Sequence, residues 1–145
     1  MQDGRAIRIR CQGQWTTTAS TPTLIFGLRW GGVSGTVIAK TAACTTVAST
    51  TAAMWDLDII VQTRSNGSTG TVMGIGTARV FAGVAGTIAS TTGEGLVTPM
   101  GVAGVLAPAA VTLDLTADTA LAITVTPSTT AATLIGLNYT IESMN

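Results

Sequence analysis

The sequence contains no histidine, a single lysine, two cysteines and few charged residues of either sign. Charged residues make up 10% of the 145 residues, whereas an ordinary domain carries about a quarter. Without histidine, the Ser-His-Asp and Cys-His nucleophile systems and most zinc and iron sites are excluded. Seven basic and seven acidic residues cancel, so the basic surface of a nucleic-acid binder is also missing. We therefore predict no enzyme, no cofactor and no nucleic-acid partner.

Long hydrophobic runs are also missing, although 46% of the residues are hydrophobic. The longest candidate, Leu96 to Val111, is shorter than the roughly 20 residues of a spanning helix and contains Pro99 and Pro108. No basic segment followed by an apolar stretch opens the chain, so no secretory signal is predicted. A chain with so little charge and no membrane span is expected to bury surface against copies of itself or a larger assembly.

The two cysteines, Cys11 and Cys44, are expected to be buried free thiols, because nothing in the sequence places them together. Two cysteine ligands without histidine do not form a zinc site.

The stretch from Met54 to Phe81 predicts a long antiparallel hairpin. Apolar residues alternate with polar ones in its first arm, which is the period of a strand with one buried face. The apolar set is Trp55, Leu57, Ile59 and Val61, and the polar set is Asp56, Asp58 and Gln62. Asn66-Gly67 and Gly70 follow, where the chain must reverse.

Eight strands are expected in all, and no helix. They begin at Ala6, Thr23, Thr36, Trp55, Thr71, Val111, Ala120 and Thr133. The last strand, Thr133 to Glu142, is expected to turn Ile135, Leu137, Tyr139 and Ile141 inward. This pattern predicts a single all-β domain over residues 1–145, an antiparallel eight-stranded jelly-roll sandwich. An immunoglobulin-like sandwich is the second choice, because no cysteine follows Trp55.

Residues 82–110 form a long Gly/Ala/Thr-rich loop in this prediction. A structureless loop of this length is uncommon in a compact domain. Its apolar residues suit an excursion that packs on a neighbouring subunit or another partner. A cross-over connection over one end of the same domain explains them equally well. The candidate contact residues are Leu96, Val97, Met100, Val102, Val105 and Leu106.

Two further groups could carry chemistry or binding. Asp56 and Asp58 stand two apart on one strand face, as paired carboxylates of a hydrolase would, but the polar face of a strand explains them. Trp15 lies at the expected end of the first strand and is the most plausible exposed aromatic residue for contact with a ligand such as a sugar.

Several motifs resemble a group of structural proteins from tailed bacteriophages. These are Thr21-Pro22-Thr23-Leu24 leading to Phe26-Gly27-Leu28 and Gly31-Gly32; Trp55 leading to Thr63-Arg64-Ser65 and Gly70-Thr71-Val72-Met73; the run Thr112 to Thr116; and the final strand with Tyr139 and Glu142. The likeness spans most of the chain. It implies a jelly-roll virion protein, commonly trimeric, that carries no catalytic residues.

The resemblance implies a capsid decoration, or cement, protein that binds the major capsid protein and stabilises the head shell. Its expected location is the virion, on the head surface, after synthesis in the host cytoplasm. Its expected partners are copies of itself, as a homotrimer, and the major capsid protein or another virion protein, with no membrane. The alternative is a tail or fibre module that binds host-surface carbohydrate, with Trp15 as its contact residue.

Overall fold

A computed structural model describes residues 3–81, 96–102 and 108–144, and these contain strands but no helix. Its strands are β1 (Ala6–Thr17), β2 (Thr23–Trp30), β3 (Thr36–Lys40), β4 (Cys44–Thr45), β5 (Ala53–Ser65), β6 (Gly70–Val80), β7 (Leu96–Met100), β8 (Ala110–Leu113), β9 (Leu121–Pro127) and β10 (Ala132–Ser143). The prediction of an all-β fold is confirmed. The prediction of eight strands was two short, since β4 and β7 were not expected.

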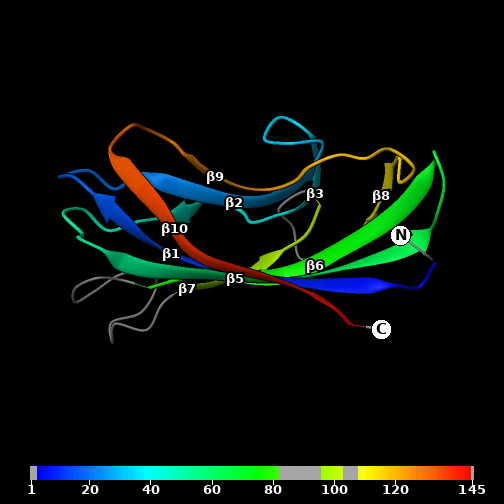
Figure 1. Ribbon diagram of the computed structural model, residues 1–145. Coiled ribbons are helices and arrows are strands. Elements are labelled where there is room, and N and C mark those ends of the chain that lie inside the picture. The colour runs from blue at the N-terminus through cyan, green and yellow to red at the C-terminus, as the bar shows by residue number, and fades with distance from the viewer. Residues whose placement is uncertain (1–2, 82–95, 103–107, 145) are drawn as a thin grey trace.

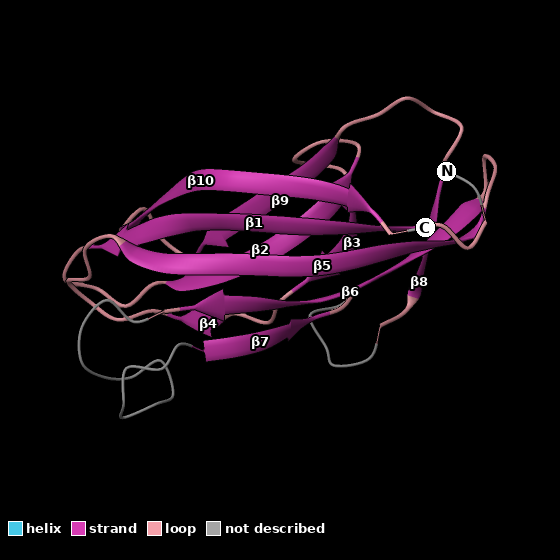
Figure 2. Ribbon diagram, turned by 60° about the horizontal axis from the view of Figure 1, so that its bottom comes forward, coloured by secondary structure: helices cyan, strands magenta, loops and turns pink. Residues whose placement is uncertain are grey.

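The strands form two antiparallel sheets that pack face to face as a sandwich (Figure 1). In the six-stranded sheet the order is β10-β1-β5-β6-β7, and β8 pairs with another part of β6. In the four-stranded sheet β2 is central, with β9 on one side and β3 and β4 on the other. Strands β9 and β10 therefore lie at edges of their sheets (Figure 2).

The predicted hairpin is confirmed as β5 and β6, which pair from Trp55–Val80 to Ser65–Thr71. Its turn contains Gly67 at a φ of 110°, a conformation that favours glycine. Farther along β6, a Cβ on Gly74 would lie 2.6 Å from Cγ2 of Ile38 in the opposite sheet. The missing side chain therefore lets the two sheets approach at this point.

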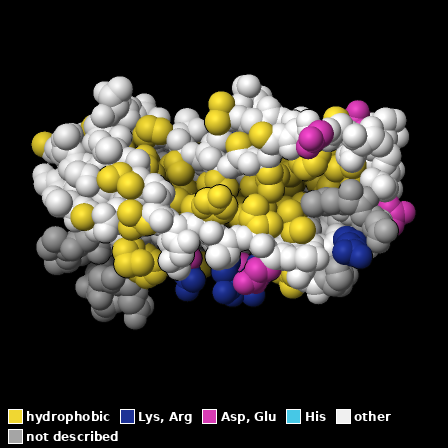
Figure 3. Space-filling model, viewed as in Figure 1, with side chains coloured by type: hydrophobic (Ala, Val, Ile, Leu, Met, Phe, Trp, Pro, Cys, Tyr) yellow, Lys and Arg dark blue, Asp and Glu magenta, His cyan; other side chains and the backbone are white. Residues whose placement is uncertain are grey.

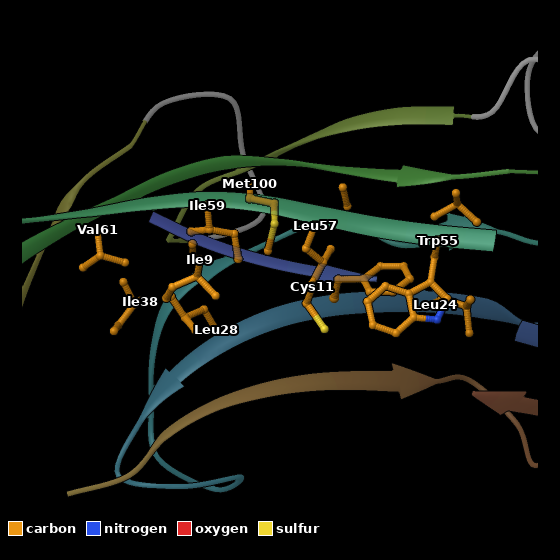
Figure 4. Close-up of a cluster of buried hydrophobic side chains, with 14 of the residues drawn as sticks. Ile9, Cys11, Leu24, Leu28, Ile38, Trp55, Leu57, Ile59, Val61 and Met100 are labelled. Carbon is orange, nitrogen blue, oxygen red and sulfur yellow. The ribbon is translucent and has the colours of Figure 1, made fainter. Parts of the chain in front are cut away.

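The core lies between the two sheets and is made of the alternate apolar residues of the long strands. Figure 4 shows members of it reaching toward one another from both sheets. The rings of Phe26 and Trp55 have centroids 5.5 Å apart. The largest fully buried side chains include Trp15, Phe26, Ile9, Leu24, Leu28, Ile38, Leu57, Ile59 and Val61.

Threonine hydroxyls satisfy backbone groups at one end of the sandwich, where the chain between β3 and β5 crosses between the sheets. Thr41 is buried and its Oγ1 accepts a hydrogen bond from the Phe26 amide at 3.1 Å. Thr46 Oγ1 donates to the Pro22 carbonyl. Thr17 Oγ1 donates to the Val47 carbonyl. These bonds explain how a Thr-rich segment with almost no charge packs against the domain.

The loop predicted for residues 82–110 is wrong at its centre, because β7 pairs with β6 from Val80–Leu96 to Gly76–Met100. Pro99 is tolerated within β7 because β7 is an edge strand, where a missing amide need not bond to a neighbour. Gly101 then exchanges backbone hydrogen bonds with Lys40, and these join the two sheets. The remaining parts of the predicted loop, residues 82–95 and 103–107, lie outside the described residues.

Candidate interaction surface

The sandwich is open on the side where β9 and β10 form the sheet edges. A hollow of about 510 Å³ lies there between the sheets. It is lined by Ile9, Cys11, Leu28, Leu121, Ile123, Tyr139 and Ile141. Hydrophobic side chains fill the band between the sheets in Figure 3, which views this side. No lining residue is charged, so this hollow is an apolar surface.

A bulge in β10 sets which of its residues face the hollow. The pairing of β1 with β10 shifts between Gln12 and Gly13, so Leu137 is an extra residue with no partner in the register. A Cβ on Gly13 would overlap the Trp55 ring and the Ile135 carbonyl oxygen, so glycine is required beside the bulge. A bulge reverses the faces of the residues beyond it.

The prediction that Ile135, Leu137, Tyr139 and Ile141 point inward is right for Tyr139 and Ile141 and wrong for Ile135, and none of the four is buried. Their side chains are 53%, 61%, 72% and 55% exposed, respectively. Tyr139 and Ile141 lie opposite the inward-facing Cys11 and Ile9 and therefore share the inner face. They are exposed because the second sheet ends at β9 and does not cover them.

Strand β9 forms the other rim of the hollow. Its alternating residues Leu121, Ile123 and Val125 all pack against the core but are only half-buried. Their partial exposure has the same cause as that of Tyr139, namely that each sheet ends before it covers the edge of the other.

A cluster of five charged side chains, Arg8, Arg10, Asp56, Asp58 and Arg79, lies on the outer face of the six-stranded sheet. Arg8 donates two hydrogen bonds to the Asp58 carboxylate, from Nε at 2.8 Å and from Nη2. Arg79 Nε donates to Asp56 Oδ1 at 2.8 Å. Arg10 Nε lies 3.6 Å from Asp58 Oδ2. The hydrogen bonds from Arg8 hold the pKa of Asp58 below its usual range, although partial burial opposes this.

These pairs decide between the two interpretations of Asp56 and Asp58. Each carboxylate is held by an arginine, and the depression of about 220 Å³ above them is lined by the same paired groups. A general acid for glycoside hydrolysis needs a raised pKa, whereas that of Asp58 is lowered. The arrangement therefore favours the polar strand face.

Trp15 is not an exposed contact residue. Strand β1 runs on to Thr17, beyond the predicted end at Gln14, and the Trp15 side chain is fully buried. Its Nε1 has no hydrogen-bond partner among the described residues. Of the six aromatic residues, all of which the structure describes, Tyr139 alone is exposed.

The predicted contact residues of the loop are divided by strand β7. Met100 is buried in the core and is not available to a partner, whereas Val102 is partly buried against the core. Val97 is 58% exposed. Leu96 pairs with Val80 through the backbone. The Leu96 side chain, Val105 and Leu106 lie outside the described residues.

The two cysteines are free and buried, as predicted. Burial raises the pKa of the Cys11 thiol, which keeps it protonated at neutral pH. Among the described residues no group of three or more histidine, cysteine or acidic side chains could hold a metal ion. The described part of the chain also contains no helix with the length and apolarity that a membrane crossing requires.

Comparison of the chain with protein-family models, with curated proteins and with solved structures finds no match. The interpretation of the surface therefore depends on the residues themselves.

Proposed function

We propose that the chain is a structural protein of a tailed-bacteriophage particle, a capsid decoration protein with a jelly-roll fold. Copies associate as a homotrimer, bind the major capsid protein on the head surface and stabilise the shell by burying apolar surface. The observation that carries this proposal is the exposed apolar hollow on the β9–β10 side, whose lining contains no charged residue. An exposed surface of that kind is typical of a protein that binds other protein.

The sequence supports the same proposal. The low charge content fits a subunit whose outer faces are shared with other subunits, and the resemblance to phage structural proteins spans most of the chain. A decoration protein needs no chemistry, only contacts that bind the assembled shell more tightly than free subunits. The paired carboxylates on the outer face are consistent with that passive role.

A tail or fibre module that binds carbohydrate is the weaker proposal. It depended on an exposed Trp15, which is buried. Tyr139 is exposed, but it borders an apolar hollow without the polar groups that would bind sugar hydroxyls.

The test is cryo-electron microscopy of intact phage particles that contain the chain. We expect density for the two-sheet sandwich in clusters of three on the outer surface of the head lattice. Density confined to the tail would refute the head assignment and support the alternative module. Absence of the chain from purified particles would refute a structural role altogether.

A further inference from the structure

The free edge of β10 is only lightly protected. Among the described strands, β10 pairs with β1 alone, so the other side of its backbone has no strand partner (Figure 2). Edge strands of monomeric proteins are commonly protected by lysine, proline, inward-pointing charge or a β-bulge. Strand β10 has the bulge at Leu137 but no lysine or proline, and its only charged residue is Glu142, next to its end.

The inner face of β10 is apolar, whereas its outer face carries polar residues and one exposed apolar residue. Because of the bulge, Tyr139 and Ile141 lie on the inner face, whereas Ile135 shares the outer face with Gln14. Leu137 stands between them at the bulge and is 61% exposed. Single exposed apolar residues are ordinary, but four on one edge strand are not.

The hollow beside β10 can receive apolar side chains. Its floor includes Ile9 and Leu28, which are almost fully buried. A Cβ built on Gly136, at the inner face of β10, would meet no atom within 4 Å. The only polar side-chain groups among the lining residues are the Tyr139 hydroxyl and the Cys11 thiol. Small-molecule sites use several placed polar groups to orient a ligand, so this lining fits an apolar protein segment better.

We propose that β10 of a second copy of this chain occupies the hollow between β9 and β10. This inference rests on the self-association included in the proposed function and names the surface that carries it. The segment that enters the hollow must be uncharged, because a charge in this hollow would find no partner. Strand β10 fits this requirement from Ala132 to Ile141, and it carries exposed apolar side chains that can enter the hollow.

The same strand also supplies the rim of the hollow, which makes the contact self-complementary. When copies are arranged around a rotation axis beside β10, each copy gives Tyr139 and Ile141 to one neighbour and receives those of another. The exposed inner-face side chains of β10 are then covered by one kind of contact. Closed rotational symmetry of this kind leaves no subunit with an uncovered surface.

The test compares the mass of the full chain with that of two lysine variants by sedimentation velocity across a range of concentrations. Ile141→Lys places a charge in the hollow. Ile75→Lys is the matched control, because Ile75 is 48% exposed on β6 and does not line the hollow, whereas Ile141 is 55% exposed. We expect the wild type and Ile75→Lys to be trimeric, and Ile141→Lys to associate at least about 30-fold more weakly.

Circular dichroism must show the same β-sheet content in all three proteins, since both substituted residues lie at the surface. Tyr139→Ser is a second variant without added charge, and it should weaken association in the same direction. A wild type that stays monomeric at its highest soluble concentration would overturn the inference. So would an unchanged mass for Ile141→Lys, or a small apolar molecule found in a monomeric wild type by native mass spectrometry.

Binding to expanded phage heads separates this inference from the proposed function. A monomeric wild type that still binds heads would overturn the β10 contact and leave the decoration role standing. A trimer that Ile141→Lys dissociates, but that binds no heads, would support the β10 contact and refute the decoration role.

Discussion

Gly13 provides the sharpest test of how β10 is placed. It lies on the inner face of β1, opposite Gly136 of β10 and next to the bulge at Leu137. A methyl group at position 13 would overlap the Trp55 ring and the Ile135 carbonyl oxygen. We expect Gly13→Ala to destabilise the fold strongly and Gly136→Ala, its cross-strand partner, to have almost no effect.

The expected loss of stability in Gly13→Ala follows from the displacement of Trp55, which must move to make room for the added methyl group. Trp55 is only 3% exposed, and its Nε1 donates a hydrogen bond to the Gln14 carbonyl at 3.2 Å. Overpacking a core costs about 1–3 kcal/mol, and loss of that bond adds about 1 kcal/mol. The expected loss for Gly13→Ala is therefore about 2–4 kcal/mol, or about 5–15 °C in Tm for a chain of this size. Gly136→Ala should change the free energy of unfolding by less than about 0.5 kcal/mol.

Urea denaturation followed by tryptophan fluorescence measures both values. The variants are compared at the same low concentration, because association would shift the apparent stability. If Gly13→Ala and Gly136→Ala have equal effects, the bulge and the packing of Trp55 against Gly13 are wrong.

Three further substitutions test other parts of the structure. Asp58→Asn should lower the free energy of unfolding at neutral pH. Because Arg8 lowers the folded-state pKa of Asp58, this contribution is present above the unfolded pKa of about 3.9 and is lost as pH falls through the folded pKa. The difference from wild type, measured by denaturation from pH 7 to pH 2, should vanish in acid, and a constant difference would contradict the pairing. Thr41→Val should cost about 1–2 kcal/mol in the same assay, because the buried Phe26 amide loses its acceptor, whereas Thr41→Ser should stay close to wild type. Trp15→Phe should cost less than about 1 kcal/mol in thermal unfolding, because the lost Nε1 makes no bond among the described residues, whereas Trp15→Ala should cost about 3–5 kcal/mol.

The strands that alternate cleanly could be predicted from the sequence. The strand that was expected to begin at Thr23 is β2, and the hairpin from Met54 to Phe81 contains β5 and β6. In both, one sheet face is buried along the whole strand, so the period of two is visible in the residues.

Strands β7 and β10 show why the rest could not be predicted. In β7, Pro99 and the flanking glycines indicate a loop, and only the position of β7 at a sheet edge permits the proline. In β10 the alternation of Ile135, Leu137, Tyr139 and Ile141 is regular, but the bulge breaks its correspondence with the faces. Gly13 and Gly136 were the available signal, since glycine inside a strand often marks a bulge.

The candidate surface was missed for a related reason. Alternation predicts which residues share a face but not whether a second sheet reaches far enough to cover that face. Tyr139 and Ile141 have the pattern of core residues and lie on the inner face, yet the second sheet ends at β9. The prediction for Trp15 was wrong in the opposite sense, because Trp15 was expected to be exposed at the end of the first strand, whereas β1 continues to Thr17.

Hydrogen exchange of the β10 backbone amides in the wild-type protein tests the central claim most directly. If the apolar edge is covered by another copy, the amides from Asn138 to Ile141 should exchange as slowly as those of the interior strand β5 and become fast in Ile141→Lys. Fast exchange along β10 in the concentrated wild-type protein, with β5 protected, would show that this edge is open and would contradict the account.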